Sequence, residues 1–431
     1  MSRHVWRWTI AWLAIVAPAW AAAQEPGAEA PWENLITGDT LAGWVQRGGK
    51  AEYRVENGEI VGRSVPGTPN SFLCTERIFG DFELELEFKV DPRLNSGVQV
   101  RSNSVPGYRD GVVHGYQVEI DPSERSWTGG IYDESRRGWL FSLEGKEAAR
   151  QAFRQGQWNK LRVVAAGDSL KTWVNDVPAA DLADALTRTG FIALQVHATQ
   201  ETEPLEVRWR NIRVRDLGVP TSRPPTGALV LLGASGDLSA WEHADKPGAT
   251  VQWKFRDGAL EIEPGTGNLV TKRAFGDFQL HVEFNVDDSG KPGQANGNSG
   301  VYLQRRYEIQ ILNSCGQEPA DNICGAIYKV KAGDFNMALP AGQWQTYDIT
   351  FRAARWDAAG NKTGNARVTV YHNGTRIHDD VEIPGPTGAG APEAPTDGPL
   401  LLQDHGHRVR FRNIWILPLD RTPAHKAGGS R

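Results

Sequence analysis

The chain has 431 residues, of which 40% are hydrophobic and 23% charged, and its formal net charge is −5. This length predicts two or three domains, because a single hydrophobic core rarely serves so long a chain. The absence of a basic excess or a Lys/Arg-rich tract argues against nucleic acid or a membrane surface as a partner.

Residues 1–23 have the pattern of a signal peptide. Arg3 and Arg7 precede a mostly apolar segment at 9–20, and three alanines at 21–23 offer a cleavage site. An uncleaved membrane anchor is the less favoured alternative, because the apolar segment is short and contains Pro18. No other stretch approaches the ~18 apolar residues of a membrane span. We therefore expect an exported protein, periplasmic or secreted, with no transmembrane anchor after signal removal.

Alternating apolar residues predict β-strands along most of the chain. In segment 82–89, the apolar residues Phe82, Leu84, Leu86 and Phe88 alternate with charged ones. One apolar face is typical of an antiparallel sheet that covers a core on one side. Helical periodicity is nearly absent and the turns are rich in Gly and Pro. The predicted fold class is therefore all-β, a sandwich or jelly roll.

Four short motifs occur twice in the same order, at an offset of about 190 to 200 residues. They are Phe-Gly-Asp-Phe at 79–82 and 275–278, Asn-Ser-Gly-Val at 95–98 and 298–301, Gly-Gln-Trp at 156–158 and 342–344, and Arg-Asn-Ile at 210–212 and 412–414. So long a period indicates tandem domains rather than a solenoid. We expect one copy at 32–217 and a second at 227–419, joined by a Pro-rich linker at 218–226.

In the last strand of each copy, the alternation of apolar residues shifts by one position. Val207 and Trp209 share a face, after which the apolar positions move to Ile212 and Val214, and the second copy slips at the same place. One extra residue, at Asn211 and at Asn413, predicts a β-bulge.

A second class of strand carries polar side chains on one face. The residues that share faces are Gln117, Glu119 and Asp121; Glu308 and Gln310; Gln99 and Arg101; Tyr302 and Gln304; Gln195 and His197; and Gln403 and His405. A solvated outer face is the alternative interpretation. Because amides, carboxylates and imidazoles recur at matched places in both copies, we favour a site for hydroxyl-rich ligands.

Glu119 and Asp121 could in principle form a conventional glycosidase pair, since alternate residues of a strand lie ~7 Å apart. The second copy keeps only one carboxylate on this strand, Glu308, beside Gln310. A paired-carboxylate mechanism could therefore operate in the first copy only, and this weakens the hypothesis of a conventional glycosidase.

The cysteines permit one disulfide. Cys315 and Cys324 lie nine positions apart across a turn, and export allows their oxidation, so we favour a bond over two separate thiols. Cys74 fits a core position. No cofactor is certain: a divalent metal, calcium, could bind at 287–298, although a long turn is the favoured interpretation there. The identity of any metal ligand is unknown.

The motifs together resemble the 3-keto-disaccharide hydrolase family, whose domain is a concanavalin A-like jelly-roll β-sandwich. The pieces that carry the resemblance are 95–97, 115–121, 128–132, 136–139 and 194–197 in the first copy, and 297–303, 307–311, 324–328, 340–344, 402–406 and 411–414 in the second. They cover nearly all of residues 32–419. The resemblance therefore implies two tandem sandwiches of this type that act on a carbohydrate substrate.

The resemblance also implies hydrolysis of glycosides whose C3 hydroxyl is already oxidised to a ketone. The ketone acidifies the hydrogen at C2, so the aglycone at C1 leaves by elimination and hydration follows. This route needs a base, a group that polarises the ketone, and help for the departing oxygen.

The implied roles fall on matched residues of the two copies. In the first copy, His197 or Glu119 is the expected base, Arg101 polarises the ketone, and Gln117, Tyr132 and Gln195 position the sugar. Asp121, Arg137 and Trp139 are further candidates for substrate binding. In the second copy the set is Glu308, His405, Gln310, Tyr328 and Gln403. A lectin-like carbohydrate-binding protein without catalysis remains the alternative.

Overall fold

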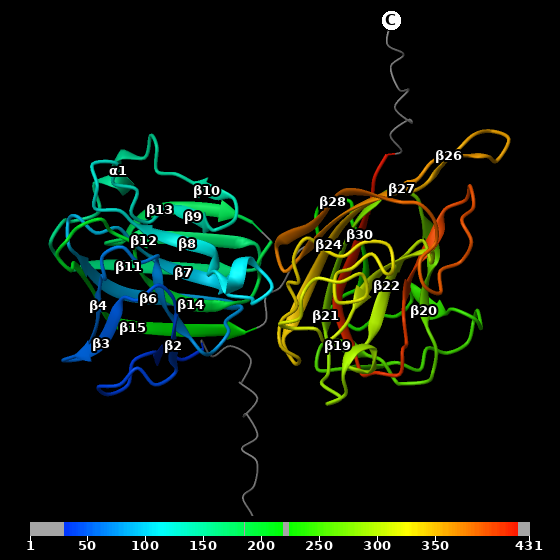
Figure 1. Cartoon of the computed structure of the whole chain (residues 1–431), viewed down its shortest axis with the longest axis horizontal. Helices are drawn as coiled ribbons and strands as arrows, with labels where there is room; N and C mark the ends of the chain where they lie inside the picture. The colour runs from blue at the N-terminus through cyan, green and yellow to red at the C-terminus, as the bar shows by residue number, and fades with distance from the viewer. Residues whose placement is uncertain (1–29, 185, 219–223, 421–431) are drawn as a thin grey trace, which may run out of the picture.

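The computed structural model describes residues 30–184, 186–218 and 224–420. Two all-β halves lie side by side, each built from antiparallel sheets (Figure 1). The expectation of two tandem concanavalin A-like jelly-roll β-sandwiches is confirmed. The predicted signal peptide at 1–23 and residues 219–223 of the predicted linker lie outside the described residues. Within the described ranges, no helix is both long and apolar enough to cross a membrane.

The first half has two large sheets. Its outer sheet has the order β13 (Val177–Ala183), β12 (Ser169–Val174), β11 (Asn159–Ala166), β6 (Asp81–Val90), β15 (Glu206–Gly218), β4 (Glu59–Arg63) and β3 (Glu52–Glu56), and β1 (Glu33–Asn34) pairs with β15. Its inner sheet has the order β10 (Gly138–Phe141), β9 (Ile131–Glu134), β8 (His114–Ile120), β7 (Ser96–Asn103), β14 (Phe191–Val196), β5 (Ser71–Thr75) and β2 (Trp44–Gly48).

The second half repeats this arrangement with a shorter inner sheet. Its outer sheet has the order β18 (Lys254–Arg256), β19 (Ala259–Glu261), β30 (Arg410–Pro418), β21 (Phe278–Asn285), β24 (Trp344–Arg352), β27 (Ala366–His372) and β28 (Thr375–Ile383), and β16 (Leu229–Leu232) pairs with β30. Its inner sheet has the order β17 (Trp241–His243), β20 (Leu269–Phe275), β29 (Gly398–Leu402), β22 (Ser299–Leu303) and β23 (Tyr307–Ile311). A small hairpin joins β25 (Arg355–Trp356) to β26 (Lys362–Gly364).

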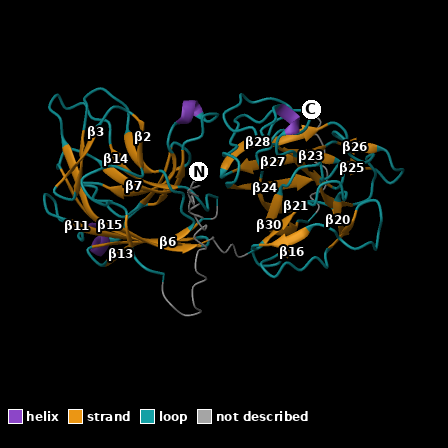
Figure 2. Ribbon diagram, turned by 90° about the horizontal axis from the view of Figure 1, so that it is seen from below, coloured by secondary structure: helices purple, strands orange, loops and turns teal. Residues whose placement is uncertain are grey.

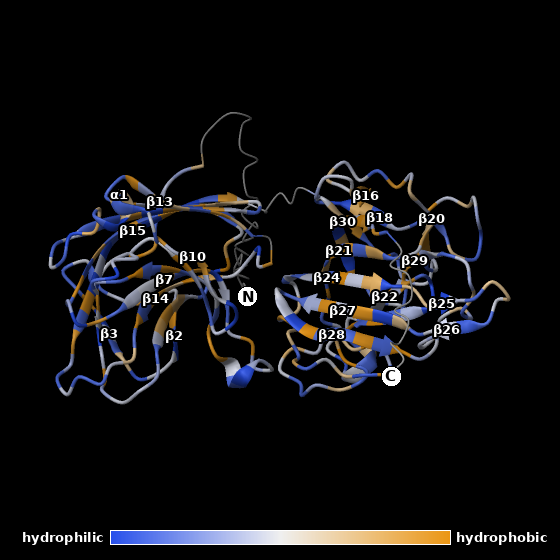
Figure 3. Cartoon of the chain, turned by 90° about the horizontal axis from the view of Figure 1, so that it is seen from above, coloured by the Kyte–Doolittle hydropathy of each residue, from blue (hydrophilic) through white to orange (hydrophobic). Residues whose placement is uncertain are grey.

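Helix is confined to short pieces, as Figure 2 shows: α1 (Glu147–Arg150) and two 3₁₀ turns, Arg109–Gly111 and Gly293–Ala295, within the described ranges. The predicted alternation along β6 is confirmed, because its apolar side chains are buried while its glutamates are partly exposed. Figure 3 shows the same alternation of hydrophilic and hydrophobic residues along β24, β27 and β28. Burial of one face of each sheet builds a separate core in each half.

The predicted β-bulges are present in both copies. Asn211 and Asn413 adopt left-handed backbone conformations, with φ values of 53° and 46°. The register of β15 against β6 shifts between Arg210 and Arg213, which is the extra residue that the sequence indicated. Asparagine suits this position because it enters the left-handed region at low cost.

The loop between β7 and β8 of the first half packs against the second half. Val105 and Tyr108 belong to the core of the second half, and the Tyr108 ring packs edge-on against Phe335 at a centroid distance of 4.8 Å. A side chain at Gly107 would meet the backbone oxygen of Asn336 at 2.4 Å. The two halves therefore touch through a loop that starts at the inner sheet of the first half.

The predicted disulfide between Cys315 and Cys324 is wrong, because the structure holds both residues as free thiols. Cys324 is buried, with its Sγ 3.1 Å from the Tyr347 hydroxyl, whereas Cys315 is partly exposed. The nine-residue separation allowed ring closure but could not show that the Cys324 side chain faces the core. Cys74 is buried, as predicted.

Candidate functional site

A polar cavity of about 450 Å³, here called the first cavity, lies on the exposed face of the inner sheet of the first half. It is lined by Asn70, Asn95, Gln117, Glu119, Arg125, Tyr132, Glu134, Trp139 and His197. Five of the predicted site residues therefore meet in one place: Gln117, Glu119, Tyr132, Trp139 and His197. Glu119 on β8 and His197, which follows β14, line the same cavity.

Strand alternation explains this convergence. Val118 and Ile120 point into the core, so Gln117 and Glu119 on β8 point to the opposite face. The register then sets Gln117 opposite Tyr132 on β9. The Gln117 side chain donates to a Glu119 oxygen at 2.9 Å and accepts from Gln99 at 2.8 Å.

Glycine at position 97 gives this row of side chains its space. Gly97 pairs with Glu119, and a Cβ atom built on it would lie 2.5 Å from the Gln117 side chain. In the second copy, a Cβ on Gly300 would lie 2.4 Å from the Glu308 carboxylate. The repeated Asn-Ser-Gly motif therefore supplies the floor of a cavity in each half.

We expect Gly97→Ala to displace Gln117 and to lower the free energy of unfolding by about 1–3 kcal/mol, the usual cost of overpacking. Thermal unfolding and turnover measured on the same samples would check this. Gly385→Ala is the matched control, because a Cβ atom at this position would have no neighbour within 4 Å. If Gly97→Ala matched the control in both measurements, close packing over Gly97 would not hold the cavity in shape.

Glu119 is a buried carboxyl that is held by amides. Asn95 donates to its Oε1 atom at 2.8 Å, and Gln117 donates to its Oε2 atom. Burial raises the pKa of Glu119, against the lowering effect of these hydrogen bonds. The Arg125 guanidinium lies 3.6 Å from the Oε1 atom. Both carboxylate oxygens thus have fixed directions.

Glu134 is a second carboxyl in the cavity, and the sequence analysis missed it. Burial, and after it the nearby Glu119 charge, raise the pKa of Glu134 to about 7. Asn70 donates to it over a long distance of 3.5 Å. The signal was present in the sequence, because Glu134 follows Tyr132 at the alternate position of the same strand. Two carboxyls with raised pKa values in one cavity mark a candidate for proton-transfer chemistry.

Arg125 is the cation of the first cavity and was also missed. Its guanidinium stacks over the rings of Trp127 and Trp139 at 4.8 and 5.0 Å. Asp121 does not line the cavity; it accepts from Arg125 at 2.8 Å and from the backbone of Trp127 at 3.1 Å. The carboxylate predicted to bind substrate instead fixes the loop that carries the cation.

His197 directly follows the last residue of β14 and lines the cavity. Its Nδ1 atom lies 2.7 Å from the Ala198 carbonyl oxygen, which can only accept a hydrogen bond. The proton of the neutral ring therefore sits on Nδ1, and Nε2 keeps the lone pair. The imidazole is held in the tautomer that a base at Nε2 needs.

Arg101 does not reach the cavity. It is fully buried, with a left-handed φ of 47°, and its guanidinium bonds Asp81 at 2.7 Å and the carbonyl oxygens of Gly80 and Gly167. Burial lowers the pKa of Arg101 to about 10. Its counterpart Gln304 bonds the Phe275 carbonyl oxygen at 2.7 Å in the same way. The expectation that Arg101 polarises a ketone is therefore wrong, because its side chain does not line the cavity. Its hydrogen bonds instead hold the segments that contain Gly80, Asp81 and Gly167 in place.

Arg101→Ala should lower the free energy of unfolding by about 3–5 kcal/mol, because it removes one partner of a buried ion pair. Chemical denaturation would measure this loss. Arg154→Ala, at an exposed arginine, is the control. If Arg101→Ala kept full stability but lost turnover, Arg101 would have a direct role in the reaction.

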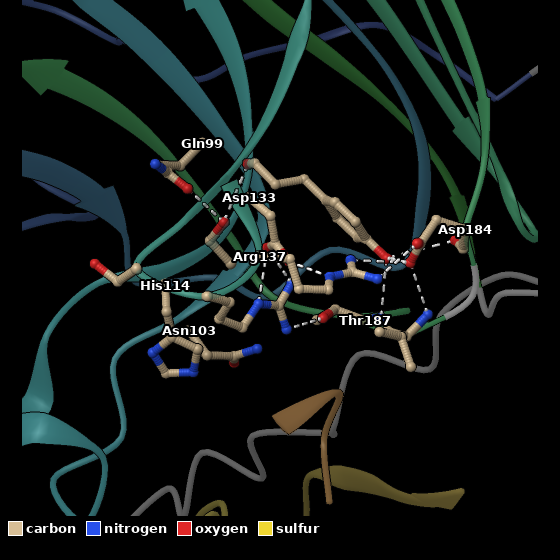
Figure 4. Close-up of polar contacts among 12 residues, drawn as sticks. Gln99, Asn103, His114, Asp133, Arg137, Asp184 and Thr187 are labelled. Carbon is tan, nitrogen blue, oxygen red and sulfur yellow. Dashed lines mark hydrogen bonds and ion pairs between the residues drawn. The ribbon is translucent and has the colours of Figure 1, made fainter. Parts of the chain in front are cut away.

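Two further predicted residues lie away from the cavity. Arg137 bonds Asp133 and Asp184, and Figure 4 shows its guanidinium turned toward these carboxylates. It therefore belongs to a structural ion network. Gln195 is fully buried on the cavity face of the sheet, beside Gly97, and both polar atoms of its amide lack a hydrogen-bond partner within the described part of the chain. It lies below the cavity lining rather than in it.

The second half holds a smaller cavity of about 260 Å³, here called the second cavity. It is lined by Gln294, Asn298, Tyr302, Glu308, Gln310, Tyr328, Gly388, Ala389, Gln403 and His405. All five predicted residues of this copy, Glu308, Gln310, Tyr328, Gln403 and His405, meet here. Gln294 and the 388–389 loop come from segments without strand periodicity and were missed.

Among the described residues, no group of three or more His, Cys, Asp or Glu side chains could hold a metal ion. In the suggested calcium segment, the Ser289 hydroxyl donates to Ala295 and Asp288 accepts from Gly290, as in a long turn. Metal binding there stays a prediction.

Comparison with known proteins identifies the family. A family model described as the 3-keto-alpha-glucoside-1,2-lyase-like domain matches residues 31–215 and 229–417. The chain belongs to this family. Both matches fall within the two sandwiches, so each half is one 3-keto-alpha-glucoside-1,2-lyase-like domain. At the coarse level, this places the protein among carbohydrate-acting, glycosyl hydrolase-like or carbohydrate-binding proteins.

Solved structures similar to the chain each match about one domain. A candidate glycosyl hydrolase from Parabacteroides distasonis ATCC 8503 is 34% identical, with 45% of this chain and 84% of that chain covered and a TM-score of 0.42. A second one from the same organism is 19% identical, with 45% and 95% covered and a TM-score of 0.35. The carbohydrate-binding module CBM66 from Bacillus subtilis is 16% identical, with 42% and 99% covered and a TM-score of 0.31. No curated protein matches the chain.

Proposed function

We propose that the protein is exported and that its first cavity cleaves 3-keto-glycosides by elimination followed by hydration. The observation that carries the proposal is the meeting of a base, a cation, one buried carboxyl and one half-buried carboxyl in one cavity: His197, Arg125, Glu119 and Glu134. Elimination next to a ketone needs these three kinds of group.

The first step is removal of the proton at C2. The Nε2 atom of His197 takes this proton, because Nδ1 is occupied by its hydrogen bond to Ala198. The electron pair of the C2–H bond moves into the ketone and forms an enolate. Arg125 stabilises the enolate oxygen, since it is the cation that lines the cavity and its guanidinium is fixed by Asp121 and the two Trp rings.

The second step breaks the bond between C1 and the aglycone oxygen. The enolate electrons form a C1–C2 double bond, and the leaving oxygen takes a proton from Glu134. This carboxyl suits the role because its pKa of about 7 keeps it partly protonated at neutral pH. Water then adds at C1 and a proton returns to C2, which gives the free 3-keto sugar and the alcohol.

Glu119 positions the sugar in this scheme. Its oxygens are directed by Asn95 and Gln117, so it accepts hydrogen bonds from sugar hydroxyls in a fixed orientation. Trp139 and Tyr132 pack edge to face at 5.3 Å and form an aromatic wall for the sugar ring.

The test is aglycone release by the purified full chain from a 3-keto-glucoside and from its parent glucoside. We expect release from the keto substrate alone. Binding of either glycoside without release, in buffers with and without added divalent metal, would contradict cleavage and leave a lectin-like function.

A further inference from the structure

The two cavities share a backbone arrangement in which a carboxylate and an amide have exchanged strand positions. The backbone N–H of Glu119 donates to Gly130, and that of Gln310 donates to Ala326, each at 3.0 Å. Glu119 pairs with Gly97, as Gln310 pairs with Gly300. Gln310 therefore occupies the place of Glu119, and Glu308 occupies the place of Gln117.

The neighbours of this position have changed with it. In the first cavity, Glu119 accepts from Asn95 and lies beside Arg125. In the second cavity, the Gln310 amide donates instead to Asn298 at 3.2 Å and to Gln294 at 3.1 Å. Neutral amides therefore stand in the second cavity where the first has an ion pair. No Lys or Arg is among the described residues that line the second cavity. An enolate formed there would have no cation to stabilise it.

Two residues that line the second cavity carry acceptors that are not satisfied. The Oε1 atoms of Gln310 and Gln403 are buried and have no hydrogen-bond partner among the described residues. Glu308 has one oxygen bonded to the Tyr302 hydroxyl at 2.7 Å, and Gln403 donates to the same hydroxyl. Buried acceptors without partners call for a ligand that donates hydrogen bonds, because an unpaired buried acceptor is costly.

We propose that the second cavity is a non-catalytic binding site for an unoxidised hexopyranoside, the 3-hydroxy sugar. A sugar hydroxyl donates to the buried acceptors, whereas a ketone oxygen cannot donate. A site built to accept a hydroxyl proton discriminates against the analogue that lacks it. The division of labour between the cavities rests on the proposed cleavage in the first; the binding itself rests on the second cavity alone.

Isothermal titration of the full chain with methyl glucoside, galactoside and mannoside tests the proposal. We expect at least one to bind, at least ~10-fold more tightly than its 3-keto form. Binding should weaken at least ~10-fold in Gln403→Leu and in Gln310→Leu, and should persist in the matched first-cavity variant Glu119→Gln. Circular dichroism spectra and unfolding curves establish that each variant is folded, and the two second-cavity variants act as independent tests.

Binding of none of the three glycosides by the wild type would overturn the proposal. So would a loss of binding in Glu119→Gln but not in the second-cavity variants. Turnover of a 3-keto-glucoside that fell as far in Gln403→Leu and Gln310→Leu as in Glu119→Gln would show that the second cavity is catalytic. Glycoside binding at the second cavity, together with no turnover by the wild type, would sustain this inference and refute the proposed cleavage.

Discussion

His197→Ala is expected to lower kcat for aglycone release from a 3-keto-glucoside by about 10²–10⁴-fold, the usual contribution of a positioned base. The Nδ1 hydrogen bond to Ala198 leaves only Nε2 to take the C2 proton, and no other imidazole lines the first cavity among the described residues. Added imidazole should restore part of the lost rate, since small bases can enter the space left by the side chain. Stopped assays of the released alcohol would measure both effects.

His407→Ala serves as the control, because this histidine lies outside the lining of either cavity. A folded His197→Ala variant with wild-type kcat would show that His197 is not the base. If His405→Ala lost the activity instead, cleavage would have to be placed in the second cavity.

Glu134→Gln is expected to remove the alkaline limb of the pH profile and to lower kcat about 10²-fold or more at pH 6. Burial raises the pKa of Glu134 to about 7, so the protonated acid is lost as pH rises through 7 and kcat/KM of the wild type falls tenfold per pH unit above it. Glutamine keeps the shape but has no acidic proton. Initial rates between pH 5 and 9 would show whether the limb disappears.

The same substitution should change stability in a defined pH window. The folded-state pKa of about 7 lies above the ordinary value of 4.5, so the wild type binds this proton more tightly when folded. Its stability therefore falls as pH rises from 4.5 to 7, by about 3 kcal/mol. Glu134→Gln should be the more stable protein at pH 8 but not at pH 4. Glu203→Gln, at an exposed glutamate, is the control; a profile like that of the control would show that folding does not raise the pKa of Glu134.

Strand periodicity predicted most of both cavities. Once Val118 and Ile120 were assigned to the core, Gln117 and Glu119 had to face the other way, and the same logic placed Glu308 beside Gln310. Strand periodicity could also have identified Glu134, because this residue lies two positions after Tyr132 on the same face of β9. Periodicity works here because both cavities stand on regular sheet.

The same rule failed at Arg101, for a local reason. Arg101 shares a face with Gln99 only if the strand is regular, but its φ is 47° and the register of β7 against β8 shifts between Val100 and Asn103. This irregularity turns the side chain toward Asp81. Partners so far apart in sequence cannot be identified from spacing.

Two loop residues of the cavities were beyond prediction. Arg125 and Gln294 reach their cavities from connecting segments that have no period, and their positions depend on Asp121 and on the Asn322 carbonyl oxygen. The Asn-Ser-Gly repeat was visible in the sequence, but its role as a cavity floor follows only from the short distances to Gln117 and Glu308.

The most direct test of the central claim uses a 3-keto-glucoside that carries deuterium at C2. Elimination breaks the C2–D bond, so the account predicts a slower rate than for the unlabelled substrate and free 3-keto sugar whose C2 deuterium has been lost to water. Cleavage at an undiminished rate, with the deuterium retained in the product collected immediately after turnover, would show direct hydrolysis and contradict the account.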